Sequence, residues 1–242
     1  MGWIRYSSIY ISIMLTLKRS RDIKVAASLT NGGAVRIANS FGILSGKEYS
    51  CPGATSICER VCYAGRLERI RPSVREVMAS NWHAVSTADK ATLVQLLSTM
   101  IEDFKRECDR WNAPKLFRIH WDGDFFSPDY VDAWRQIILK YTDIRFWTYT
   151  RVPSAARALQ GLENLAIYFS ADDENLREAM TLKEEGVAIA MLRDTFEEAK
   201  ATFPRAAMCP EQRGQIPLAG ACPSCGICIR GEADMTFSIT KR

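Results

Sequence analysis

Seven of the eight cysteines stand in two tight groups, and thiols packed this closely carry the most distinctive chemistry of the chain. Thiolates are soft ligands that favour zinc or iron–sulfur clusters. Disulfides are the competing interpretation, but they belong mainly to small proteins of oxidising compartments. A chain of 242 residues can bury a hydrophobic core without disulfide cross-links. The two groups are Cys51, Cys58 and Cys62, and Cys209, Cys222, Cys225 and Cys228.

The first group has the spacing C-x6-C-x3-C in a loop that contains proline and glycine. Three thiolates are one short of a closed tetrahedral zinc site. They predict one of three arrangements. The first is a [4Fe–4S] cluster with one iron left open to a small molecule. The others are a site completed by a further ligand such as His83, and zinc with one bound water.

The second group has the spacing C-x12-C-x2-C-x2-C. Four thiolates satisfy either a structural zinc site or a fully ligated [4Fe–4S] centre. The close triplet Cys222, Cys225 and Cys228 resembles the opening of a bacterial ferredoxin run, which favours the cluster over zinc. The remaining cysteine, Cys108, lies in a helical run and is expected to be a small buried hydrophobic side chain.

Short apolar segments alternate with amphipathic helical segments from Leu116 onward, a pattern typical of βαβ units and a parallel sheet. The expected strands are 34–39, 116–120, 144–150, 165–170, 187–192 and 205–208. The expected helices are 72–85, 91–111, 130–141, 154–162, 174–185 and 195–202. About six strands are fewer than the eight of a closed barrel. The predicted fold class is therefore α/β, a partial (β/α) barrel, with a doubly wound sheet as the alternative.

Polar side chains follow the expected strands, where parallel α/β folds place their chemistry. The candidate catalytic residues are Asp122, Asp124, Arg151 and Asp172, and the candidate cofactor-binding residues are Gly123, Asp124 and Ser170. In the stretch WDGDFF, two acids surround a glycine between large aromatic residues, which suggests a tight turn whose carboxylates face a cleft. The alternative is that these residues are turn and helix-capping residues with exposed acids.

Hydrophobic residues make up 47% of the chain, and its formal net charge is +4, as expected of a globular protein. The mild charge permits an anionic partner without requiring one. Residues 3–17 are mostly apolar but too short to span a bilayer, which takes about 20 residues. We expect a cytoplasmic protein without membrane contact. The expected division is an N-terminal extension (1–30), a barrel-like domain (31–208) and a cysteine-rich metal segment (209–242). The extension either reflects a mis-assigned start codon or forms a loosely packed strand.

The order of these features resembles radical S-adenosylmethionine enzymes, in which a cysteine triplet after one strand precedes a glycine–acid turn after the next. The resemblance implies that Cys51, Cys58 and Cys62 hold a [4Fe–4S] cluster and that Gly123 and Asp124 stand near the amino group of the cofactor. Members of that superfamily use the spacing C-x3-C-x2-C, from which this chain departs. The second cysteine group would then resemble an auxiliary cluster.

Five segments in the same order resemble a bacteriophage family called gene product eighty-eight. They are CPGATSIC with VCYAGR, RIHWDGDFFSPDYVDAW, FWTYTR, YFSADDE, and the closing CP with ACPSCGIC. This resemblance covers residues from about 40 to 230 and implies a phage or prophage origin and a metal or cluster, without naming a reaction.

The leading functional hypothesis is an iron–sulfur enzyme, radical-type or otherwise redox, with one or two [4Fe–4S] clusters and S-adenosylmethionine as a candidate cofactor. Such an enzyme needs an electron donor and acts on a small-molecule or nucleic-acid substrate. The alternative is a nucleic-acid-binding module stabilised by zinc or a cluster and without catalysis. The basic stretch 66–71 and the aromatic residues Trp147, Tyr149 and Tyr168 motivate that alternative, because basic grooves with stacking rings bind single strands.

Overall fold

A seven-stranded parallel sheet forms the centre of the structure, which is a computed structural model that describes residues 16–25, 27–30 and 33–240. The strand order is β3-β4-β5-β6-β7-β9-β8, and every neighbouring pair is parallel. The strands are β3 (Ser40–Gly42), β4 (Leu116–Asp122), β5 (Arg145–Thr150), β6 (Leu165–Ala171), β7 (Ala188–Arg193), β8 (Ala207–Met208) and β9 (Met235–Ser238).

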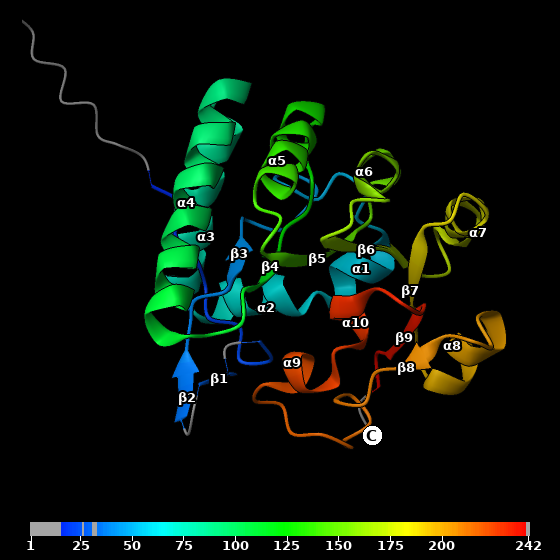
Figure 1. Cartoon of the computed structure of the whole chain (residues 1–242). Coiled ribbons are helices and arrows are strands. Elements are labelled where there is room, and N and C mark those ends of the chain that lie inside the picture. The colour runs from blue at the N-terminus through cyan, green and yellow to red at the C-terminus, as the bar shows by residue number, and fades with distance from the viewer. Residues whose placement is uncertain (1–15, 26, 31–32, 241–242) are drawn as a thin grey trace, which may run out of the picture.

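The long helices cover one face of this sheet, and the C-terminal segment lies on the other face (Figure 1). The helices are α1 (Ser56–Val61), α2 (Tyr63–Ile70), α3 (Pro72–Ser86), α4 (Lys90–Trp111), α5 (Pro128–Lys140), α6 (Pro153–Leu159), α7 (Leu176–Glu184), α8 (Phe196–Thr202), α9 (Ala221–Cys225) and α10 (Ile227–Arg230). Strands β3 to β7 follow one another in chain order, whereas a doubly wound sheet reverses its order at a switch point. The predicted α/β class with a parallel sheet is therefore confirmed, and the sheet is open and has seven strands instead of the predicted six.

Two strand predictions differ from the structure. Residues 34–39 do not form a strand of the main sheet, because β1 (Ala27–Thr30) and β2 (Gly33–Arg36) pair antiparallel as a separate hairpin. The shorter β3 lies beside β4 instead. Strand β9 was missed because four residues are too few to show a strand pattern, and it lies inside the segment predicted to hold a metal.

Alternation along the central strands builds two separate cores, since successive strand residues face opposite sides of a sheet. On the helix-covered face, Phe146 and Ile167 pack with Trp134 of α5 in the largest core. On the opposite, concave face, Trp147 and Tyr168 pack with the C-terminal segment. The aromatic residues Trp147, Tyr149 and Tyr168 thus lie under that segment, so the predicted stacking groove is wrong for these three.

Local capping explains where several helices begin and end. Ser127 caps α5 by accepting a hydrogen bond from the Tyr130 N–H, with a proline at the first helical position. Thr195 and Glu198 form a capping box on α8. Gly186 lies just beyond the end of α7 with a positive φ of +92°, which glycine adopts readily at the end of a helix.

The N-terminal stretch before the hairpin is tied to the rest of the molecule. The Lys18 N–H donates to Asn81 of α3, and the Lys24 carbonyl accepts from the Cys222 N–H. Half of the predicted extension 1–30, residues 1–15, lies outside the described residues. None of the described helices is both long and apolar enough to cross a membrane.

Substituting Gly123 should test how tightly the turn after β4 is packed. At φ +80°, an added Cβ would meet Ile43 Cγ1 and Ser50 Oγ, each at 2.5 Å. Gly161 has almost the same φ, +79°, and open space around it. We expect Gly161→Ala to cost about 1 kcal/mol of unfolding free energy from backbone strain alone, and Gly123→Ala about 3 kcal/mol or more. Urea unfolding measures both, and equal losses would contradict the packing argument.

Candidate functional site

The loop that carries the first cysteine group lies against the carboxyl ends of the sheet strands. Cys51 follows β3, Cys58 lies in the first turn of α1, and Cys62 caps the N-terminus of α2 by accepting a hydrogen bond from the Gly65 N–H at 3.3 Å. Gly53 lies so close to β5 that an added Cβ would stand 2.2 Å from the Arg151 carbonyl oxygen. The loop therefore has a fixed position on the sheet.

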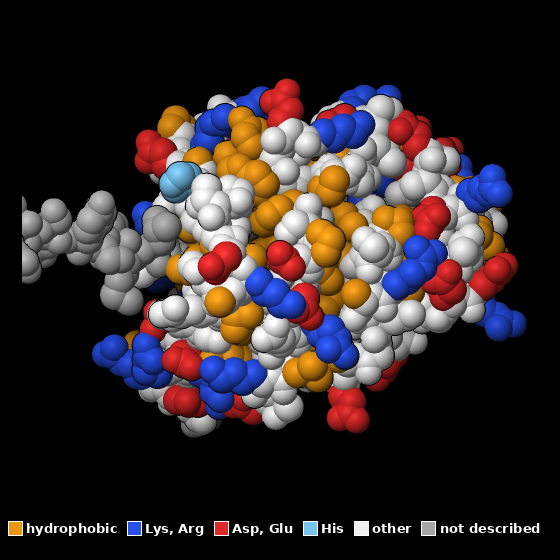
Figure 2. Space-filling model, turned by 90° about the horizontal axis from the view of Figure 1, so that it is seen from above, with side chains coloured by type: hydrophobic (Ala, Val, Ile, Leu, Met, Phe, Trp, Pro, Cys, Tyr) orange, Lys and Arg blue, Asp and Glu red, His pale blue; other side chains and the backbone are white. Residues whose placement is uncertain are grey.

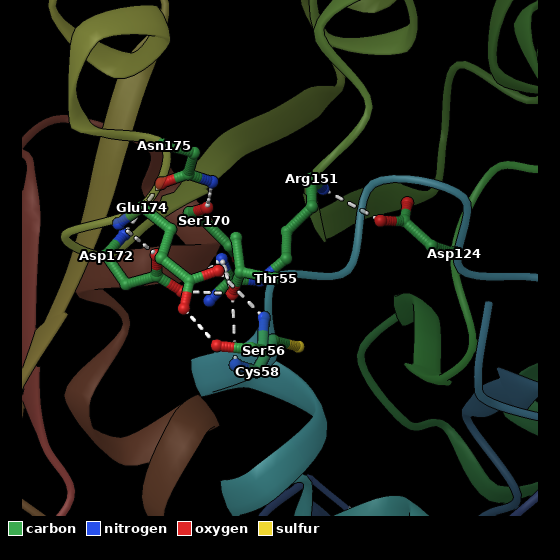
Figure 3. Close-up of polar contacts among 9 residues, drawn as sticks. All are labelled: Thr55, Ser56, Cys58, Asp124, Arg151, Ser170, Asp172, Glu174 and Asn175. Atoms are coloured by element: carbon green, nitrogen blue, oxygen red, sulfur yellow. Dashed lines mark hydrogen bonds and ion pairs between the residues drawn. The ribbon is translucent and has the colours of Figure 1, made fainter.

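Thr55 links this loop to two strands through one hydroxyl group. Its Oγ1 donates to Asp172 Oδ2 at 2.6 Å and accepts from the Cys58 N–H at 3.0 Å. Arg151 Nη1 donates to the same Asp172 oxygen at 2.6 Å and to Thr55 Oγ1 at 3.3 Å. Arg151 lies between Asp172 and Asp124 (Figure 3). The predicted residues Arg151 and Asp172 thus meet in a buried ion pair at the N-terminal end of α1.

Glu174 makes a second connection between β6 and α1. Its carboxylate accepts from the Ser56 N–H at 2.9 Å and from the Ser56 hydroxyl. Asn175 holds the turn by donating to the Ser170 carbonyl at 3.0 Å and accepting from the Asp172 N–H at 2.8 Å. Ser170, predicted as a cofactor contact, contributes its carbonyl oxygen to this turn.

Both carboxylate oxygens of Asp124 accept hydrogen bonds from protein groups. One carboxylate oxygen accepts from Thr150 Oγ1 at 2.6 Å and from the Phe125 N–H at 2.7 Å, and the other accepts from the Arg151 N–H at 2.7 Å. Burial raises the pKa of Asp124 to about 6, against the lowering effect of these hydrogen bonds. In this arrangement Asp124 fixes the ends of β4 and β5 to each other.

Asp122 has the opposite environment, although only Gly123 separates the two acids. It is 2% exposed, and neither carboxylate oxygen makes a hydrogen bond of good geometry within the described residues. Burial, reinforced by the negative charge of the neighbouring Glu68 on α2, raises the pKa of Asp122 to about 9. This environment favours the neutral form of the Asp122 carboxyl group. Both acids of WDGDFF are buried and not exposed on a turn.

The thiols of the first group are half-buried neighbours. Burial raises the pKa of Cys51 to about 12, with further contributions from the charges of Asp124 and Cys58. Burial also raises the pKa of Cys58, and there the nearby Arg151 lowers it while Cys62 raises it. Burial thus favours the neutral thiols of Cys51 and Cys58, and a bound metal cation would favour their ionisation.

The second cysteine group lies on the concave face beneath β5 and β6. Cys222 and Cys228 pack beside Tyr149, and burial raises their pKa values to about 12 and 11. The charges of Cys209 and Cys225 contribute to the Cys228 shift, so all four thiols are neighbours. The Arg118 guanidinium lowers the pKa of both buried thiols and would offset the negative charge of a thiolate set.

The donor chemistry of both groups fits a thiophilic metal or cluster, and all eight cysteines are free thiols. However, within residues 16–25, 27–30 and 33–240, no three His, Cys, Asp or Glu side chains are already assembled in a geometry that could hold a metal ion. The predicted metal segment accordingly contains no preformed metal site. The residues fit in type and neighbourhood, and binding would require the side chains to reorient.

The two histidines, of which His83 was the predicted further ligand, lie away from the cysteine loop. His120 does not face the cysteine loop: it is buried on the helix-covered face, where its Nε2 lies 2.9 Å from the Tyr130 hydroxyl, and burial lowers its pKa to about 3. His83 is exposed on α3 and does not complete the first group. Thr55, Glu68 and Glu174 were not predicted, although a threonine that precedes a helix is a recognisable cap.

The two acids around Gly123 should respond oppositely to amidation. Asp124→Asn would turn an amide toward hydrogen-bond donors, and we expect it to lose about 2–4 kcal/mol of unfolding free energy. Asp122→Asn should instead stabilise the protein by about 1–2 kcal/mol near pH 8.5.

The gain from Asp122→Asn should grow with pH. The side chain of an unfolded Asp ionises at about pH 4, whereas burial raises the pKa of the folded Asp122 to about 9. The free energy of unfolding of the wild type therefore decreases as the pH rises between these two values. Urea unfolding at pH 5.5 and pH 8.5, with Asp129→Asn as the exposed control, measures the effect. A gain that did not grow with pH would refute the assignment.

Comparison with known proteins places the chain among phage proteins. A family model described as Gene product 88 matches residues 15–231. The Gene 88 protein of Mycobacterium phage L5 is 49% identical over 239 residues, which cover 95% of this chain and 100% of that protein. The Gene 88 protein of Mycobacterium phage D29 is 49% identical over 240 residues, with the same coverage. No solved structure matches. The chain belongs to the Gene product 88 family.

Proposed function

We propose that this protein is an iron–sulfur redox enzyme whose reaction centre is a cluster held by Cys51, Cys58 and Cys62. The observation that carries the proposal is the attachment of their loop to the carboxyl ends of β4, β5 and β6 through Asp124, Arg151 and Asp172. A disordered or purely surface loop would not need such anchoring. At this edge of a parallel α/β sheet, ligands reach polar groups from several strands.

Three cysteine ligands would leave one iron with an open coordination position, where a small molecule can bind and receive an electron. S-Adenosylmethionine is the candidate co-substrate, and a separate electron donor would be needed. Zinc at either cysteine group is the alternative metal.

The protein's own groups would bind and orient the substrate. Arg151 uses Nη1 for Asp172 and Thr55, and its other guanidinium N–H groups make no hydrogen bond within the described residues. A guanidinium fixed at one nitrogen is well suited to bind a carboxylate or phosphate with the remaining donors. Because Arg151 also influences the pKa of Cys58, an anion bound to it would lie near the three-cysteine loop.

The second cysteine group would have a different role. Four thiolates leave no open metal position, and the group joins α9, α10 and the end of β8 over the concave face. A metal or cluster there would hold the C-terminal segment on the sheet or serve as an electron relay.

Metal analysis of anaerobically purified protein tests the proposal. We expect iron and acid-labile sulfide in equal amounts. The variant Cys51→Ala/Cys58→Ala/Cys62→Ala should lose about half of both, and Cys222→Ala/Cys225→Ala/Cys228→Ala should lose the other half, if each group holds four irons. Cys108→Ala is the matched control, because Cys108 is buried in the core and belongs to neither group.

Zinc without sulfide would refute the iron–sulfur proposal, as would full iron content in the variant of the first group. If the clusters are present, incubation with S-adenosylmethionine and a reductant separates the radical reaction from other redox chemistry. Release of deoxyadenosine supports the radical reaction, and its absence with an intact cluster excludes it.

A further inference from the structure

The outward face of α2 carries arginines together with exposed apolar side chains. Tyr63, Arg66 and Ile70 follow at helical spacing and project from the same side, while Ala64, Gly65 and Glu68 are buried on the other. Tyr63 is 53% and Ile70 60% exposed. A merely solvated helix face would be polar throughout, so this face has the composition of a binding surface. We call it the α2 surface: Tyr63, Arg66, Arg69, Ile70 and Arg71.

The arginines of the α2 surface lack acidic partners. Charged side chains of both signs are interspersed over the face drawn in Figure 2, and many basic residues form ion pairs, from Arg19 with Glu107 to Arg230 with Glu232. Arg66, Arg69 and Arg71 are exposed and make no ion pair within the described part of the chain. Three exposed, unpaired arginines within residues 66–71 give this segment a positive charge that the mild net charge of +4 does not reveal.

Tyr63 is held in place at one end while its ring is half exposed. Its hydroxyl donates to the Trp121 carbonyl at 2.8 Å, and the two rings lie 6.5 Å apart at an angle of 40°. A ring fixed in this way loses little conformational entropy when a planar group stacks on it.

We propose that the α2 surface binds single-stranded nucleic acid. Guanidinium groups form forked hydrogen bonds with phosphates, and exposed aromatic rings stack on unpaired bases, so the combination fits a single strand. The surface begins at the residue after Cys62, so a bound strand would run beside the three-cysteine loop. Binding by these side chains needs no metal, and this proposal is therefore independent of the iron–sulfur proposal.

Fluorescence anisotropy with labelled oligo-dT and oligo-U at low salt tests the proposal on the full chain. We expect Arg66→Gln/Arg69→Gln/Arg71→Gln to weaken binding at least about tenfold. It should also reduce the slope of log K against log salt by about 2, since each phosphate contact on a single strand contributes about 0.7. The control Arg135→Gln/Arg177→Gln/Arg205→Gln removes the same charge from exposed arginines elsewhere and should bind nearly as the wild type does.

Stacking is tested separately at Tyr63. Tyr63→Ala should weaken binding about tenfold without changing the salt slope, whereas Tyr63→Phe keeps the ring and should retain binding. Cys58→Ala should bind as the wild type does, so loss of the metal and loss of binding can be told apart.

Three results would overturn the proposal. The first is no binding of either oligonucleotide at low salt. The second is an equal loss in the two triple-arginine variants, which would indicate a general charge effect. The third is binding of poly-glutamate as tight as that of the oligonucleotides, which would indicate an acidic protein partner.

Discussion

The buried ion pair between Arg151 and Asp172 is the contact on which the arrangement of the candidate site depends. It joins the ends of β5 and β6, and through Thr55 it also holds the first turn of α1. A buried ion pair is stable only when hydrogen bonds satisfy its remaining atoms. Here Thr55 and the Glu174 N–H supply them on the Asp172 side. The position of the first cysteine group therefore follows from the polar chemistry of two strands distant in sequence.

The two acids around Gly123 show how one turn serves two purposes. Asp124 has three donors and stabilises the contact between strands, whereas Asp122 is buried without such donors, which favours its protonated form. An acid kept protonated in this way costs stability, and natural proteins tolerate that cost mostly where a group serves binding or chemistry. The proximity of Glu68 on α2 connects this turn to the helix that carries the α2 surface.

Much of the fold could be predicted from the sequence, because the strands from Leu116 to Leu192 are apolar, short and regularly separated by amphipathic helices. The shortest elements could not: β9 has four residues, and the predicted strand 34–39 competes with a hairpin whose pairing is local. Of the candidate site, the polar residues at the strand ends were identifiable by position. Their pairing was not, because the contact of Thr55 with Asp172 spans 117 residues of sequence. The exposure of Tyr63 could not be predicted either, because the next two residues, Ala64 and Gly65, are buried and the sequence does not indicate which side of α2 faces solvent.

The position of β9 between β7 and β8 constrains the order in which the molecule is completed. Strand β8 pairs only with β9 within the described sheet, yet it is synthesised first, and the 26 residues 209–234 separate the two strands. Until β9 emerges from the ribosome, β8 has no neighbour and Cys209 has no fixed place beside the other three thiols. The loop with Cys51, Cys58 and Cys62, in contrast, needs only strands as far as β6. The two thiol groups thus mature at different stages of synthesis, and the one nearer the N-terminus can take its final form on a chain that is still growing.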